Sequence, residues 1–561
     1  MKSSRGMPGL GMGVVRAIVL VGAVFLALRG ALTGSFIFDD YALLALPRFL
    51  DNPLQPFWHQ HVEGGLHYRP LGVLLWWLSE RLFGADAYLH YLLNAALLSA
   101  VVLALWRLLV RLVGAEGSAF AIAFAFAVHP IAIGTTVWLS NRYELLASVL
   151  GLLALSQAWE YRQTRRAGAL LGTLLLFALG LCAKENTAAL ISAAFVFWWW
   201  PSAERPGWLD RRQLACLWLV AVFAAWLLVR HWVLPATGTE QLFAYKSPWV
   251  LFSEGMAAWF LKLPSYLFLW PRLGGVTATL FGLGALGLLL LVWSASRRPW
   301  GRERVALIMA GLALIAVAAL VQWPRTGLVL MNLHFGVDTL EDVLAARHYF
   351  MSALGMAMVM AALLAFAGQA MTLRQRLLAG LSIALLVIPL FSVSQHLARS
   401  YRGTTLEQAR FADAAVAAID KLDLAVDDCQ IYLLDTDSKL FGFYVDTTIK
   451  ALVPDLSTLG RCFVQTEFSP WYHLIERSEV ARAQKPPFSP VRAGRDTVAP
   501  ILIGHGALVF LNMAPDAKPP LGPGSFFLDW RDGSFVDVSE EVRSGRRPVR
   551  FFCFRAPSEC P

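Results

Sequence analysis

The sequence predicts a mostly α-helical, polytopic transmembrane bundle with a smaller C-terminal α/β domain, and three observations support this fold class. First, 57% of the 561 residues are hydrophobic, only 16% are charged, and the mean hydropathy is +0.55, which excludes an ordinary soluble globular protein. Second, long apolar runs recur up to about residue 400. Third, the tail has mixed charge, more Pro and Gly, and short alternating apolar runs.

About eleven apolar segments approach the roughly 20 residues that a helix needs to cross a hydrocarbon core. They lie near 14–34, 89–110, 118–139, 144–160, 168–183, 187–200, 212–234, 274–294, 304–323, 348–368 and 377–396. We therefore expect residues 1–396 to form a transmembrane module with a long first outer loop at 35–88. Residues 397–561 are expected to form a separate domain.

The basic residues predict the orientation, because Arg and Lys in short loops stay in the cytoplasm. If the N-terminus is cytoplasmic, so are the basic clusters near 107–111, 162–166, 205–212, 297–304 and 374–376. An odd number of spans then places the C-terminal domain outside the cytoplasm, as in a multi-pass protein of a bacterial inner membrane. The net charge of +9 is thereby explained by topology and does not indicate a nucleic-acid partner.

The tail carries local signals for strands and a helix. Residues 430–434 and 507–511 are expected to be strands, and 526–530 and 534–538 flank the hairpin signal Arg531-Asp532-Gly533. Residues 406–422 predict an amphipathic helix that leads from the membrane to this domain. The domain contains no nucleotide-binding fingerprint and no nucleophile motif.

Four of the six cysteines lie in the tail: Cys429, Cys462, Cys553 and Cys560. An even number in a translocated domain predicts disulfide bonds. Three pairings are open, and we favour Cys429 with Cys462 and Cys553 with Cys560. The alternative is four unpaired buried thiols.

Two adjacent carboxylates, Asp39 and Asp40, follow the first apolar segment within Phe38-Asp39-Asp40-Tyr41. We expect them at the water interface, ionised and within reach of a lipid headgroup. The alternative is a purely structural role for Asp39 and Asp40, as a helix cap or as ordinary interfacial charge. In the same loop, His59, His61 and His67 with Glu63 form a weak candidate metal site, although a solvated polar loop is the favoured interpretation.

Further polar motifs fall at the outer ends of the predicted spans. They are Tyr68-Arg69-Pro70-Leu71, His90 with Asn94, His129-Pro130, Ser140-Asn141-Arg142-Tyr143-Glu144-Leu145-Leu146, Ala183-Lys184-Glu185-Asn186 and Arg347-His348-Tyr349-Phe350. With Phe38-Asp39-Asp40, this layout resembles the integral-membrane glycosyltransferases of the GT-C type. The likeness is closest to the protein O-mannosyltransferase and TMTC-like branches, and it covers roughly residues 14 to 400.

The resemblance implies an inverting hexosyl or pentosyl transferase that uses a polyprenyl-phosphate sugar donor and an extracytoplasmic protein, lipid or glycan acceptor. It implies that Asp39 or Asp40 is the general base, and leaves open which of them acts and whether a divalent metal ion takes part. The substrate or phosphate contacts that it implies are Tyr68, Arg69, His90, Asn94, His129, Arg142, Glu144, Lys184, Glu185, Arg347, His348 and Tyr349. Lys184 and Glu185 could instead form a structural ion pair.

The chain departs from these branches in two respects. It has no repeat near 34 residues in its tail, so the acceptor cannot be taken from the TMTC-like proteins. It also carries Asp-Asp in place of Asp-Glu.

An alternative function is a transporter or flippase of lipid-linked saccharides. Such proteins usually carry mid-membrane ionisable groups or repeated halves, neither of which is evident here. Trp249, Trp259 and Trp270 are expected near an interfacial helix beside the substrate.

Overall fold

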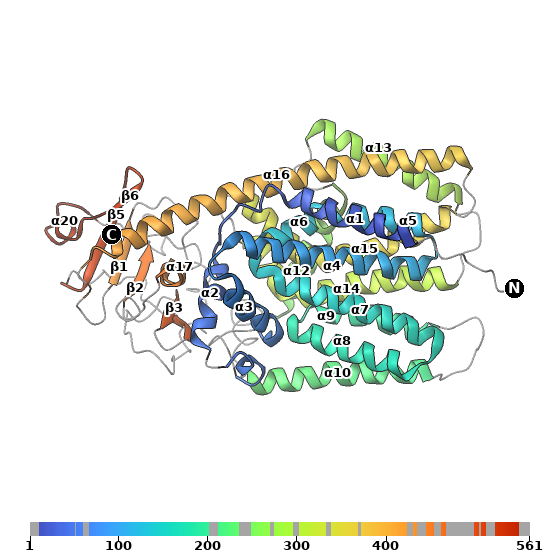
Figure 1. Ribbon diagram of the computed structural model, residues 1–561, viewed down its shortest axis with the longest axis horizontal. Helices are drawn as coiled ribbons and strands as arrows, with labels where there is room; N and C mark the ends of the chain where they lie inside the picture. The colour runs from blue at the N-terminus through green and yellow to red at the C-terminus, as the bar shows by residue number, and fades with distance from the viewer. Residues whose placement is uncertain are drawn as a thin grey trace.

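The chain is described by a computed structural model in which a helical bundle carries strands at one end (Figure 1). The N-terminus lies at the opposite end of the bundle from these strands. The structure describes residues 10–50, 52–59, 67–200, 211–234, 248–269, 274–295, 302–332, 338–368, 372–422, 424, 430–434, 445–453, 462–466, 499–503, 507–511 and 522–548.

Each apolar segment predicted from the sequence corresponds to a helix of the bundle, except that 118–139 is divided between two. In chain order the helices are α1 (Leu10–Leu28), α4 (Ala87–Val113), α5 (Glu116–Ala127), α6 (Pro130–Val137), α7 (Arg142–Thr164), α8 (Ala167–Ala183), α9 (Thr187–Trp199), α10 (Arg211–Val233), α12 (Pro248–Pro264), α13 (Gly275–Ala295), α14 (Arg302–Asn332), α15 (Asp338–Gly368) and α16 (Leu373–Ile419). A π-helical turn, η4 (Ser265–Leu269), continues α12.

The expected number of eleven spans is not confirmed. Within the described residues, seven helices are long and apolar enough to cross a membrane, or eight if α5 and α6 count as one bent span. Helices α8 and α9 are apolar but shorter than a full span. The bundle is therefore multi-pass, with several helices that fill it without the length of an independent span.

The bend between α5 and α6 has a local cause. The two helices meet at 47°, because His129 adopts an extended backbone and caps α6 while Pro130 occupies its first position. The imidazole Nδ1 of His129 accepts a hydrogen bond from the Ile131 N–H at 3.1 Å. Proline is favoured at the start of a helix, where its missing N–H is not needed. The predicted span 118–139 is thus divided at His129-Pro130 into two helices, which together are apolar enough to count as one bent span.

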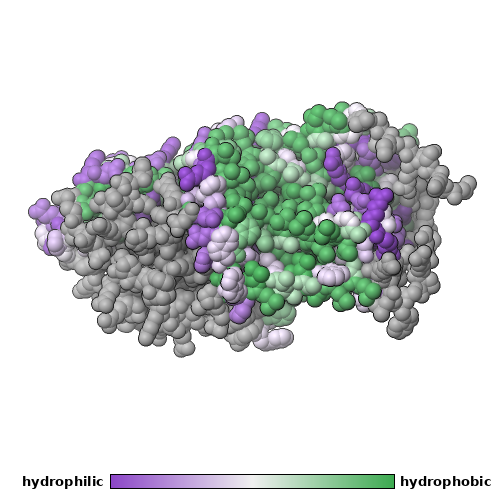
Figure 2. Space-filling view, turned by 60° about the horizontal axis from the view of Figure 1, so that its bottom comes forward, coloured by the Kyte–Doolittle hydropathy of each residue, from purple (hydrophilic) through white to green (hydrophobic). Residues whose placement is uncertain are grey.

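On the face shown in Figure 2, apolar side chains form a broad belt across the bundle. Large apolar side chains that are more than half exposed on the bundle helices include Leu171, Trp218, Leu228, Leu289 and Leu377. An apolar surface of this extent is typical of contact with lipid, where only helices with internally satisfied backbones are stable. The belt agrees with a protein embedded in a membrane.

Helix α16 joins the bundle to the C-terminal strands as one continuous element of 47 residues (Figure 1). It contains the predicted span 377–396 and most of the predicted amphipathic helix 406–422, and its backbone is helical between them. The expected domain boundary after residue 396 falls inside this helix. A capping box at Thr372 and Gln375 begins α16, and its last turns enter a second apolar core with Ala415, Ile419 and Ile431.

The C-terminal sheet has the strand order β2-β1-β5-β6, in which β1 (Gln430–Leu434) runs parallel to β2 (Phe463–Thr466) and β5 (Ser525–Arg531). Strand β6 (Ser534–Asp537) pairs antiparallel with β5, which confirms the predicted hairpin. Its turn residues Asp532 and Gly533 both have positive φ, of 50° and 83°, as a two-residue hairpin turn requires. A separate antiparallel pair joins β3 (Ala499–Ile503) and β4 (Ala507–Leu511), and a short helix α20 (Ser539–Arg543) follows β6.

The cysteines are only partly described. Cys462 is disulfide-bonded, in line with the prediction of disulfides in this domain. Cys429, Cys553 and Cys560 lie outside the described residues, so the favoured pairing stays a prediction. Cys182 and Cys216, in the bundle, are free thiols.

The first loop forms short helices at the bundle end that faces the strands (Figure 1). They are α2 (Asp39–Ala45), η1 (Leu46–Phe49), η2 (Gln55–Phe57) and α3 (Pro70–Phe83). Helix α17 (Val445–Leu452) of the tail packs against α2, and its Ala451 belongs to the apolar core of the bundle. The C-terminal part of the chain therefore contacts the helix that carries the two carboxylates.

Candidate active site

The segment Trp138–Glu144 lies at the centre of the candidate site. It comprises the 3₁₀ turn η3 (Leu139–Asn141) and the first turn of α7, at the end of the bundle that faces the first loop. Its side chains and backbone contact both carboxylates and most of the cations predicted from the sequence. We call this segment the hub.

Asp40 is fully buried, in contrast to the expectation that both carboxylates lie at the water interface. One carboxylate oxygen accepts the Ser140 N–H of the hub at 2.7 Å, and the other accepts the Ile37 N–H at 3.2 Å. Backbone donors are needed here because a buried carboxylate without partners is strongly disfavoured. Asp40 thus ties the first loop to the hub.

Asp39 is half-buried and faces a different partner. Its Oδ1 accepts the indole N–H of Trp138 at 2.8 Å. The guanidinium of Arg347 lies over the same indole ring, 4.7 Å from its centroid, and interacts electrostatically with Asp39. The Trp138 indole therefore contacts both the Asp39 carboxylate and the Arg347 guanidinium, and Asp39 is partly exposed.

Both first-loop carboxyl groups have raised pKa values. Burial raises the pKa of Asp39, against the opposing effect of Arg347. Burial and the adjoining Asp39 raise the pKa of Asp40 well above the ordinary carboxyl range. Desolvation and a neighbouring like charge both disfavour an ionised acid. Asp39 is therefore a stronger proton acceptor than an exposed aspartate.

Arg142 is fully buried, and both terminal nitrogens of its guanidinium have protein partners. Its guanidinium donates to the Ser79 hydroxyl at 2.6 Å and to His90 Nδ1 at 3.0 Å, and lies 3.7 Å from the centre of the Trp76 ring. An arginine can only donate, so His90 carries its proton on Nε2, which then donates to the Gly84 carbonyl at 2.9 Å. These contacts fasten the hub to α3 and α4.

Asn94 and His129 contact backbone carbonyls. The Asn94 amide donates to the carbonyls of Thr136 and Leu139, at 3.1 and 3.4 Å, on either side of Trp138. His129 Nε2 lies 3.1 Å from the carbonyl of Leu267 in η4. Both side chains thus fix the backbone around the site, and Asn94 fixes the turn that presents Trp138.

Arg69 forms a two-pronged ion pair with Glu185, with N–O distances of 3.0 and 2.6 Å. The same guanidinium lies 5.7 Å from the ring centre of Tyr143. Tyr68 donates its hydroxyl to the Phe57 carbonyl at 3.0 Å. The pair joins the first loop to the connection between α8 and α9.

Lys184 pairs with Glu144 at 2.6 Å, and its neighbour Glu185 pairs with Arg69, so the suggested Lys184–Glu185 ion pair was wrong. A directed chain of hydrogen bonds ends at the same Glu144: Asn186 donates to Glu144 at 2.7 Å and Gln322 donates to Asn186 at 2.6 Å. His348 lies 3.0 Å from the Gln322 carbonyl oxygen, which requires His348 to donate. Four helices or connections meet in this buried network.

Tyr349 packs in an aromatic cluster next to this network. Its ring stacks on Tyr266 at 5.1 Å and lies 4.6 Å from the ring of Trp259. The expected interfacial tryptophans thus divide: Trp259 is fully buried against α15 and Trp249 is largely exposed. Trp270 lies outside the described residues.

The candidate metal ligands do not form a described site. His59 is exposed, while His61 and Glu63 lie outside the described residues. In the part of the chain that the structure describes, no three His, Cys, Asp or Glu side chains gather closely enough to hold a metal ion. His67 is half-buried, and because two of the candidate ligands are not described, the histidine metal site stays a prediction.

Sequence reasoning missed four residues of the site: Trp76, Ser79, Trp138 and Gln322. Trp138 joins Asp39 to Arg347, and Gln322 joins Asn186 to His348. Gln322 carried one usable signal, since an amide inside an apolar span needs a buried partner. A tryptophan in an apolar run carries no such signal.

Comparisons with known proteins give two structural neighbours of similar fold. No family model matches the chain, and no match was found among curated proteins. An oligosaccharyltransferase from Archaeoglobus fulgidus, tethered to an acceptor peptide, matches with a TM-score of 0.44 and 12% identity, over 79% of this chain and 63% of that protein. ArnT from Cupriavidus metallidurans, bound to undecaprenyl phosphate, matches with a TM-score of 0.45 and 12% identity, over 79% of this chain and 85% of that protein.

Our chain therefore spans less than two thirds of the oligosaccharyltransferase. With TM-scores below 0.5, the two matches carry no conclusion about substrate or mechanism, which rest on the side chains of this protein.

Proposed function

We propose that this protein is a membrane glycosyltransferase that moves a sugar from a polyprenyl-phosphate donor to an acceptor hydroxyl or amine outside the cytoplasm. The observation that carries the proposal is the Asp39–Trp138–Arg347 arrangement, in which a partly open acid and a half-buried cation share one indole ring. Glycosyl transfer needs such a pair, because a base accepts the acceptor proton while a cation stabilises the departing phosphate.

Asp39 is the base in this proposal, and Asp40 positions it. Both oxygens of the fully buried Asp40 accept backbone N–H groups, whereas Asp39 keeps part of its surface open. Asp39 removes the proton from the acceptor as its oxygen or nitrogen attacks the anomeric carbon. The bond from that carbon to the phosphate oxygen breaks, and the lipid phosphate leaves with the electron pair. A single displacement of this kind inverts the anomeric configuration.

Arg347 is the best-supported contact for the leaving phosphate. The other predicted cations contact partners away from Asp39: Arg69 pairs with Glu185, Arg142 contacts Ser79 and His90, and Lys184 pairs with Glu144. Arg347 is half-buried beside Asp39, and a guanidinium matches the geometry of a phosphate group. The other three cations set the positive potential around the site and hold its elements in place.

Membranes that contain the full chain are expected to release undecaprenyl phosphate from a radiolabelled undecaprenyl-phosphate sugar and to pass the label to a water-soluble or protein fraction. Mannosyl, glucosyl, galactosyl and arabinosyl donors would be compared, with membranes lacking the protein as the control. A flippase would move the lipid across the bilayer without releasing undecaprenyl phosphate. Absence of release from every donor, with envelope extract supplied as the acceptor, would contradict the proposal.

We expect the site and the C-terminal strands to lie outside the cytoplasm. Alkaline phosphatase is active only after export, so a fusion truncated after residue 88 is expected to be active and one truncated after Arg166 inactive. Basic residues cluster beside Arg166, which agrees with cytoplasmic retention of that connection. The reverse pattern of phosphatase activity would place Asp39 in the cytoplasm and exclude the proposed donor side.

A further inference from the structure

Two buried tyrosine hydroxyls near the carboxylate pair have no hydrogen-bond partner among the described residues. Tyr143 belongs to the hub and is 6% exposed, and Tyr401 of α16 is 0% exposed. Buried polar groups are almost always paired, by the protein or by a bound molecule. The hydroxyls of Tyr143 and Tyr401 are therefore available to bond a polar ligand or an ordered water.

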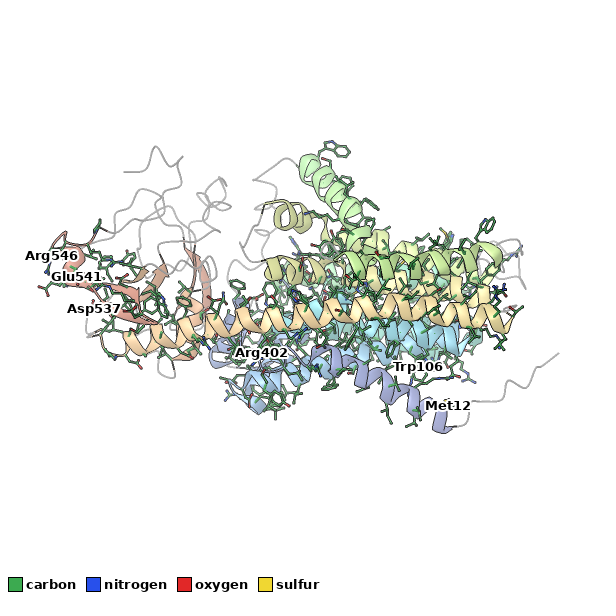
Figure 3. The ribbon with its side chains drawn as sticks, turned by 90° about the horizontal axis from the view of Figure 1, so that it is seen from above. Met12, Trp106, Arg402, Asp537, Glu541 and Arg546 are labelled. Atoms are coloured by element: carbon green, nitrogen blue, oxygen red, sulfur yellow. The ribbon has the colours of Figure 1, made fainter. Side chains whose placement is uncertain are left out.

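Tyr401 faces the first loop from α16. It lies one turn before Thr405, and residues four apart share a helix face. The Thr405 hydroxyl accepts the Ser35 N–H at 3.1 Å, and Tyr91 donates to the Ser35 carbonyl at 3.1 Å. Tyr401 also interacts electrostatically with Asp39, Asp40 and Arg347. Figure 3 marks its neighbour Arg402, midway along α16.

Tyr143 approaches the carboxylates from α7, and Gly72 determines the position of its ring. A Cβ at Gly72 would lie 2.0 Å from the Tyr143 ring, so only glycine allows α3 to approach so closely. The Arg69 guanidinium lies 5.7 Å from the ring centre. Tyr143 interacts electrostatically with Asp39 and Asp40 as well as with Arg69. The phenol is therefore held between α3, α7 and the two acids.

We propose that the hydroxyls of Tyr143 and Tyr401 bind neutral hydroxyl groups of the sugar that is transferred. A phenol is uncharged, and both donates and accepts hydrogen bonds, as a sugar hydroxyl does. Cations and acids both lie near these hydroxyls, since Tyr143 interacts with Arg69 and Arg142 and Tyr401 with Arg347, so the experiment compares a sugar ester with the bare lipid phosphate. This assignment rests on the proposed function and adds the part of the site that recognises the sugar.

The test compares two kinds of probe on the detergent-purified full chain. One is undecaprenyl phosphate, and the other is its mannosyl, glucosyl, galactosyl or arabinosyl ester. The dissociation constant of each probe is measured from the change in intrinsic fluorescence that the probe causes. Tyr401→Phe and Tyr143→Phe are each expected to weaken binding of the best glycosyl ester roughly 5- to 10-fold and to leave binding of undecaprenyl phosphate unchanged. Both changes remove only an oxygen without a partner, so the fold is retained.

Two further variants sharpen the result. Gly72→Ala keeps the Tyr143 hydroxyl but displaces its ring. Like the two tyrosine variants, it is expected to weaken binding of the glycosyl ester and to leave binding of undecaprenyl phosphate unchanged. Tyr161→Phe is the matched control, because Tyr161 is also 6% exposed on α7 but packs on Trp198 in the helical bundle. The control is expected to bind both probes as the unmodified chain does.

Equal weakening of both probes, or unchanged binding of the glycosyl ester in both tyrosine variants, would overturn the sugar assignment and leave the proposed function standing. If the unmodified chain binds none of the probes, the proposed donor is wrong and the sugar assignment fails with it.

Discussion

Replacing Asp39 by Asn is expected to lower the rate of sugar transfer by roughly 10²- to 10⁴-fold, the usual contribution of a general base. The amide oxygen of Asn still accepts the Trp138 N–H, so the hub and the loop are expected to keep their positions. The measurement is the initial rate of undecaprenyl phosphate release in membranes, normalised to the amount of inserted protein.

Asp532→Asn is the matched control for this change. Asp532 is exposed in the β5–β6 turn with φ of 50°, a conformation that asparagine tolerates well. It is expected to transfer sugar at the rate of the unmodified chain. An Asp39→Asn rate above one tenth of that rate would remove Asp39 from the role of base, and the same assay on Asp40→Asn would then examine its neighbour.

The pH profile gives a second readout of the same assignment. Burial raises the pKa of Asp39 above its ordinary value of 3.8. Only the ionised form accepts a proton, so the rate is expected to fall as pH decreases through the raised pKa. The midpoint on the acidic side therefore lies above 3.8. A rate that stays constant down to that pH is incompatible with Asp39 as the base.

Glu144→Gln is expected to destabilise the protein by about 3–5 kcal/mol, because it leaves Lys184 as a buried charge without its counterion. Glu144 is fully buried and Lys184 is 6% exposed. Glutamine keeps an oxygen that accepts from Asn186, so the change isolates the loss of charge. Thermal unfolding of the full chain in detergent, followed by intrinsic fluorescence, would measure the shift.

A second substitution separates the charge from the packing. The double variant Glu144→Gln with Lys184→Met is expected to recover most of the stability, because the uncompensated charge is removed. Glu160→Gln on the same helix is the control: its ion pair with Arg166 is 4.0 Å long and exposed, and such pairs contribute about 0–1 kcal/mol. If the double variant is no more stable than Glu144→Gln, the buried charge is not the cause.

Most helices and many residues of the candidate site could be predicted from the sequence. Which of these residues contact one another could not. Arg69, Glu144, Lys184 and Glu185 were predicted because the motifs that contain them resemble those of the GT-C type. Their pairing could not be predicted, because the contacts join residues 40 and 116 positions apart in the chain. Helix packing determines these contacts, and local sequence contains no record of it.

Two other differences also have physical causes. The buried state of Asp40 depends on the Ser140 N–H, 100 residues away, so a carboxylate at a span end was expected in water. The unbroken α16 was divided in the prediction because its hydrophobicity changes near residue 396, although its backbone stays helical through the polar residues Ser400–Thr405. Hydropathy locates the membrane boundary, whereas helix ends depend on caps and breakers.

The length of α16 has a mechanical consequence. A helix of 47 residues is about 70 Å long, and a hydrocarbon core takes up roughly 30 Å of it. The remaining turns form a rigid helical extension beyond the hydrocarbon core, and this extension ends in the apolar core of the C-terminal sheet. The height of that sheet above the bilayer is thus set by backbone hydrogen bonds rather than by a flexible tether, so a molecule that approaches the membrane beside it meets a surface at constant height.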